Sequence, residues 1–162
     1  MTARGFWTRV AVTTALAVGL LLAVSPARPV SRLPQAVALA AGAAAGVLLF
    51  AGAARRVPGL PSARSGLPMV VAKQGILGLW ALNEEIVWRR FVLGELLPVG
   101  ALAAVAVSSL GFAFAHRRRQ VLHLSTGACF GGIYLATGSL GASVAAHWFY
   151  NVLVGALADR PP

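Results

Sequence analysis

The sequence predicts an all-α protein, a polytopic transmembrane helical bundle of about six spans. Of its 162 residues, 58% are hydrophobic and only 11% are charged. A soluble domain of this length could not bury so much apolar surface, whereas a lipid bilayer accepts it directly. The apolar residues also fall into uncharged runs of about 17–25 residues, the length that a helix needs to cross a bilayer.

The first two predicted helices match no specific motif. The first covers residues 6–24 and begins with basic residues, so it could alternatively be a signal peptide that ends near Pro26. The second covers residues 33–54. The connection over residues 55–67 is polar and contains the Pro and Gly residues that are typical of turns.

Four further helices follow. The third covers residues 68–97, because Pro98 cannot continue a helix. The turn Thr137-Gly138-Ser139 is so short that the helices on either side of it should form an antiparallel hairpin. The last three helices are predicted over residues 99–116, 120–136 and 140–157.

Pairs of glycines four residues apart favour close packing of these helices. Gly42 and Gly46 form one pair, and Gly127 and Gly131 form another. For the first pair, a sequence that is simply rich in Ala and Gly is an equally good explanation.

The basic residues lie in short runs between the apolar stretches. Because they do not form one face, the net charge of +10 indicates contacts with anionic lipid headgroups, above all at Arg117–Arg119, and no nucleic-acid partner. With six spans, nine of them fall on one side and two on the other, which predicts a multi-pass protein of the inner (plasma) membrane with both termini in the cytoplasm. The nine are Arg4, Arg9, Arg55, Arg56, Arg64, Arg117, Arg118, Arg119 and Arg160, and the two are Arg28 and Arg32.

Ionisable residues inside the predicted helices are the strongest sign of function. Such a group costs roughly 2.5–3.5 kcal/mol at membrane depth, so each one needs a compensating reason. Glu85 and Arg89 are four residues apart and can pair along one helix face. Glu84 points about 100° away from Glu85 and should therefore have a histidine neighbour, for which His116 and His147 are the candidates.

Three motifs contain nearly all of these residues. Residues 84–89 fit EExxxR, residues 112–116 fit FxxxH, and residues 147–151 fit HxxxN. In this order along the chain, they resemble the motifs of the CPBP family of intramembrane proteases. That family includes the type 2 CAAX prenyl endopeptidases and bacterial proteins linked to bacteriocin self-immunity. We accordingly predict two N-terminal helices with their connection over residues 1–66 and a protease core over residues 67–162.

The resemblance implies an active site between the third, fourth and sixth helices. Glu84, with His116, would activate a water, and His147 and Asn151 would hold the oxyanion. Glu85 and Arg89 would form a structural pair that orients Glu84. Phe112 would pack beside the site.

The resemblance leaves the cofactor open between none, which we favour, and zinc. Glu84, His116 and His147 could form a zinc site with an open water position. The helical HExxH motif of zinc proteases is absent, and the family's glutamate is usually assigned a metal-free role. The single Cys129 excludes a cysteine cluster and an intrachain disulfide.

Two other functions are possible from the sequence. Ser143, one turn before His147, could be the nucleophile of a serine intramembrane protease, but the glutamates would then have no role. A membrane immunity or scaffold protein with a relic site is the non-enzymatic alternative. The substrate should be a membrane-associated or exported peptide or protein in a bacterium. Three residues fit no required position and are expected at the membrane interface: Arg90, Glu95 and His123.

Overall fold

The computed structural model describes residues 3–30, 33–53, 67–116 and 119–158, and the described chain is all-helical. Most of the predicted connection over residues 55–67, together with Arg117 and Arg118, lies outside the described residues. The helices are α1 (Ala3–Ala23), α2 (Gln35–Ala53), α3 (Leu67–Glu85), α4 (Gly94–Leu96), α5 (Ala101–Phe114), α6 (Gln120–Thr137) and α7 (Leu140–Ala158).

The third predicted helix is one continuous rod with a change of pitch. After α3, a π-helix, η1 (Ile86–Leu93), leads into the short α4, and a 3₁₀ turn, η2 (Leu97–Val99), ends the rod. The residues at both junctions of η1 keep helical backbone angles. The sequence predicted the rod but not the π-helix inside it.

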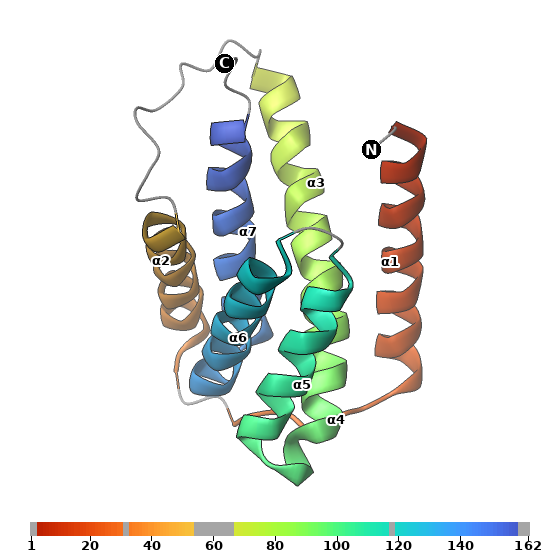
Figure 1. Cartoon of the computed structure of the whole chain (residues 1–162), viewed down its shortest axis with the longest axis vertical. Coiled ribbons are helices and arrows are strands. Elements are labelled where there is room, and N and C mark those ends of the chain that lie inside the picture. Colours follow the sequence, from red (N-terminus) through yellow and green to blue (C-terminus); the bar gives the residue numbers. More distant parts are fainter. Residues whose placement is uncertain (1–2, 31–32, 54–66, 117–118, 159–162) are drawn as a thin grey trace.

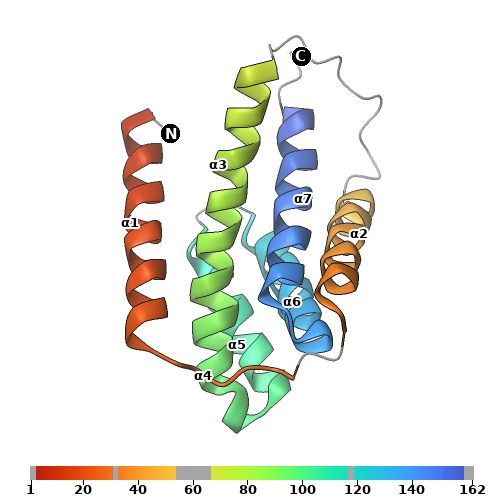
Figure 2. The ribbon, with the colours of Figure 1, turned by 180° about the vertical axis from the view of Figure 1, so that it is seen from behind.

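The bundle is built around α3 and α7, which run side by side (Figures 1 and 2). α2 packs on α7, α1 packs along α3 and η1, and α5 pairs with α6. α1 begins, α3 begins and α7 ends at the same end of the bundle (Figure 1). α5 ends and α6 begins only part of the way along α3, so these two helices cover the other end of the bundle (Figures 1 and 2).

α5 is shorter than predicted. It begins after Gly100, whose φ of 133° favours glycine, and it ends at Phe114, so that His116 follows the helix. Its 14 residues span about 21 Å, which is less than a bilayer core of about 30 Å. By length and composition, only α2 among the described helices is a candidate to cross a membrane. The six-span topology is therefore not confirmed.

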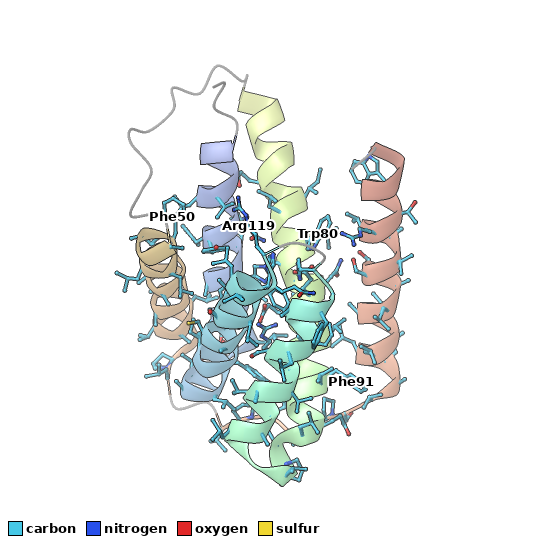
Figure 3. All side chains as sticks on the ribbon, viewed as in Figure 1. Phe50, Trp80, Phe91 and Arg119 are labelled. Carbon is cyan, nitrogen blue, oxygen red and sulfur yellow. The ribbon has the colours of Figure 1, made fainter. Side chains whose placement is uncertain are left out.

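A charged pair lies inside this bundle, among apolar side chains such as Phe112 and Phe130, and other large apolar side chains project from its surface (Figure 3). Glu85 and Arg89 are fully buried, whereas Leu22, Leu102 and Val121 are 84%, 85% and 79% exposed. A fully buried ion pair together with so many exposed large apolar side chains favours a lipid environment over water.

Close backbone contact fixes α7 against α2. A Cβ atom added at Gly42 or Gly46 would overlap the carbonyl oxygen of Ala142 or Ala146, respectively. The predicted close packing of this glycine pair is thus confirmed. A Cβ atom at Gly127 of α6 would lie 3.2 Å from the ring of Phe112 and 3.3 Å from the Cα of Ser109 on α5. At Gly131 it would meet only side chains, the nearest being that of Leu93 at 3.4 Å.

We expect Gly46→Ala to lower the free energy of unfolding by about 1–3 kcal/mol, because the backbone of α7 must move to admit a methyl group. Thermal unfolding of the purified protein in detergent measures this loss. Gly52→Ala on the same helix is the control, since a Cβ there meets nothing within 4 Å. Equal melting temperatures for the two variants would contradict the contact.

Candidate active site

Glu84, in the last turn of α3, faces two histidines from other parts of the fold. Its Oε1 lies 3.8 Å from Nε2 of His116, and its Oε2 lies 3.6 Å from Nε2 of His147. Trp80, one turn earlier on α3, donates its indole N–H to Oε1. The predicted histidine neighbours of Glu84 are therefore both present, and the sequence missed Trp80.

Hydrogen bonds place a proton on Nδ1 of both histidines. Nδ1 of His116 lies 2.8 Å from the carbonyl oxygen of Phe112, and Nδ1 of His147 lies 2.9 Å from Oε1 of Glu85. Because these oxygens only accept, each Nδ1 must carry a proton. The Nε2 atom of each ring is thus left to face Glu84. The separations of 3.6 and 3.8 Å are too long for strong direct hydrogen bonds, and a bound water can bridge groups at such distances.

Glu85 holds His147 in this orientation. Its fully buried carboxylate lies 3.2 Å from Nε of Arg89, which confirms the predicted pair. The same carboxylate accepts hydrogen bonds from Nδ1 of His147 and from the hydroxyl of Ser143. We predicted that the pair would orient Glu84, and the structure adds direct contacts of the Glu85 carboxylate with His147 and Ser143 on α7.

Arg89 connects this network to α6. Its Nη2 donates to the carbonyl of Gly127 over 2.9 Å, and its guanidinium lies over the rings of Phe112 and Phe130. The buried cation thereby has a carboxylate, a carbonyl and two aromatic faces around it.

Arg90, the next residue of the π-helix, is buried as well. It donates to the carbonyl oxygen of Pro26, in the segment that follows α1. Arg90 thus links the segment after α1 to the rod, and its predicted place at the membrane interface stays a prediction. Glu95 is exposed.

One pocket brings the predicted catalytic residues together. It has a volume of about 320 Å³, and Glu84, His116, His147 and Asn151 all line it. It extends toward the end of the bundle where α3 begins, since Leu77 is also in its wall. Trp80 and Arg119 lie at the level of this pocket, near the connection between α5 and α6 (Figure 3).

Aromatic contacts fill the inner wall of the pocket. Phe112 is buried, as predicted, and its ring centroid lies 4.7 Å from that of His116 and 5.7 Å from that of His147. The ring of Phe130 stacks on His147 at 4.7 Å. His123, for which no role at the site was predicted, also lines the pocket. The only sequence signal for His123 was its place in an apolar helix.

The described residues bear on two alternatives, a serine nucleophile and a bound metal ion. Ser143 is fully buried against Glu85 and the carbonyl of Phe130 and does not line the pocket, which disfavours a serine nucleophile. No three His, Cys, Asp or Glu side chains within the described ranges are arranged to hold a metal ion. Oε1 of Glu84 already accepts from Trp80, so a zinc ion held by Glu84, His116 and His147 would have to bind Oε2, and the zinc set stays a prediction.

We expect Glu85→Gln to lower the free energy of unfolding by about 3–5 kcal/mol, because it leaves the Arg89 cation buried without its carboxylate. Glu84→Gln is the matched control, since Glu84 lines the pocket, and the carboxylate that forms the ion pair with Arg89 belongs to Glu85. Thermal unfolding in detergent should place Glu85→Gln well below both the wild type and Glu84→Gln. A Glu85→Gln protein as stable as the wild type would mean that the pair is not structural.

Comparison with known proteins agrees with the motifs. Residues 68–153, more than half of the chain, match the family model described as type II CAAX prenyl endopeptidase Rce1-like. This match confirms the family that the three motifs predicted. No curated protein and no solved structure matches the chain.

Proposed function

Since the chain belongs to the type II CAAX prenyl endopeptidase Rce1-like family, which is a family of proteases, we propose that it is an intramembrane endopeptidase with a glutamate base. The observation that carries the proposal is the pair of histidine Nε2 atoms at 3.6 and 3.8 Å from the two carboxylate oxygens of Glu84. A water held among these groups would be polarised at one point of a pocket that is shielded by apolar helices.

In the proposed reaction, Glu84 removes a proton from this water as its oxygen attacks the scissile carbonyl. His116 holds the water through Nε2, which its own tautomer leaves as an acceptor. The indole N–H of Trp80 keeps the Glu84 carboxylate turned toward the pocket. Glu84 then gives the proton to the leaving amine, so that the carboxylate is regenerated.

His147 and Asn151 would stabilise the oxyanion. They are four residues apart on α7 and line the same pocket. For His147 to donate from Nε2, its ring must be an imidazolium, because Nδ1 already donates to Glu85. The Glu85 carboxylate would stabilise that cation, as carboxylates do for histidines in other hydrolytic sites. The two negative charges of Glu84 and Glu85 would then be balanced by the positive charges of Arg89 and the His147 imidazolium.

The site would act on a membrane-associated or exported peptide or protein. The apolar exterior supports a multi-pass protein of a bacterial plasma membrane, with the six-span topology and cytoplasmic termini that the sequence predicts. Because the pocket extends toward the end where α1 begins and α7 ends, it would open to the cytoplasm in that orientation.

We expect Glu84→Gln to reduce peptide hydrolysis by at least about 10²–10⁴-fold, because the amide keeps the shape of the side chain but cannot accept the proton. The assay would use purified protein in proteoliposomes with a mixture of internally quenched, lipid-anchored peptides. Glu95→Gln is the control, since Glu95 is an exposed carboxylate outside the pocket. Undiminished hydrolysis by Glu84→Gln would exclude this mechanism. Undiminished function of a Glu84→Ala, His147→Ala double variant in the cell would favour a scaffold.

Metal analysis distinguishes a metal-free protease from a zinc-dependent one. For the metal-free form we expect no stoichiometric zinc in the purified protein and full activity after prolonged chelation. If zinc is the cofactor, chelation should abolish hydrolysis and zinc should restore it, and His116→Ala and His147→Ala should each lose the metal.

A further inference from the structure

His116 is the more exposed of the two histidines that face Glu84. It lies beyond the end of α5, where its backbone N–H still donates to the carbonyl of Ala113 over 3.0 Å. Its side chain is 24% exposed, compared with 5% for His147, which lies within α7. One hydrogen bond, from Nδ1 to Phe112, fixes a single point of the ring. Further contacts must set the plane of the ring.

His123, in the first turn of α6, supplies such a contact. Its ring is stacked on that of His116, with centroids 3.9 Å apart and planes inclined by 18°. His123 is itself anchored, because its backbone N–H donates to Arg119 over 3.0 Å and its carbonyl accepts from Thr126 over 3.3 Å. Its ring also meets Phe112 at 5.8 Å with an interplanar angle of 71°.

We infer that His123 is a positioning residue for His116, and this inference rests on the proposed function. The His123 ring forms a flat wall that keeps the His116 imidazole in the plane in which Nδ1 reaches Phe112 and Nε2 faces Glu84. The wall acts through its aromatic face, so a ring without nitrogens can replace it. Loss of the ring leaves His116 free to turn about the side chain, and Nε2 then spends less time near the water position.

Histidine side-chain NMR tests this inference without a substrate. The full chain, ¹⁵N-labelled at histidine, is studied in detergent micelles at a pH about two units above the ordinary imidazole pKa of about 6.5. The His116 signals are assigned by their loss in His116→Gln. We expect a single Nδ1–H tautomer for His116 in the wild type and in His123→Phe, and averaged tautomers in His123→Ala. His147, held by Glu85, is the internal control and should stay unchanged. An unchanged His116 signal in His123→Ala would overturn the inference, as would equal changes in His123→Ala and His123→Phe.

Kinetics on the quenched peptides give the second readout. We expect His123→Ala to lower kcat by about tenfold to a hundredfold with little change in KM, because misplacement of a group that orients the water slows the chemical step. His123→Phe should restore kcat to within a few-fold of the wild type. A loss confined to KM, or no rescue by phenylalanine, would contradict a positioning role. If the wild type hydrolyses none of the peptides, the proposed function fails, whereas the NMR result still decides whether His123 positions His116.

Discussion

The buried carboxylate of Glu85 determines how the other parts of the site are arranged. It binds Arg89 on the same rod, and Ser143 and His147 on α7. Arg89 in turn donates to Gly127 on α6. A charge removed from water is costly unless it is paired and hydrogen-bonded. The three elements must therefore stay in contact to satisfy the pair, and the position of His147 follows from that requirement.

Two adjacent carboxylates thus have different tasks because a helix directs them about 100° apart. Glu85 points into the bundle, where cations and donors satisfy it. Glu84 points into the pocket, where its neighbours lie far enough away to leave room for a water. Environment assigns the roles of similar groups in many hydrolytic sites. The backbone contact at Gly46 also fixes the position of His147, because it holds the neighbouring Ala146 of α7 against α2.

Much of this could be predicted from the sequence, since ionisable residues in apolar helices are rare and costly. The motifs identified Glu84, His116 and His147, and the structure brings them together. Spacing along one helix cannot show which side chain of another helix completes a contact, so the link from Glu85 to His147 and the stacking of His123 were missed. A change of pitch leaves no mark in hydrophobic periodicity, which is why the π-helix and the burial of Arg90 were not anticipated.

The central claim is that Glu84 and His116 act on one water, and a double-mutant cycle of peptide hydrolysis tests it most directly. Glu84→Gln, His116→Ala and the combined variant would be compared with the wild type by kcat/KM. If both side chains serve the same water, the combined variant should be no slower than the slower single variant, because a unit already disabled by one change loses nothing more from the second. If the two losses multiply, the side chains act independently and the shared water is contradicted.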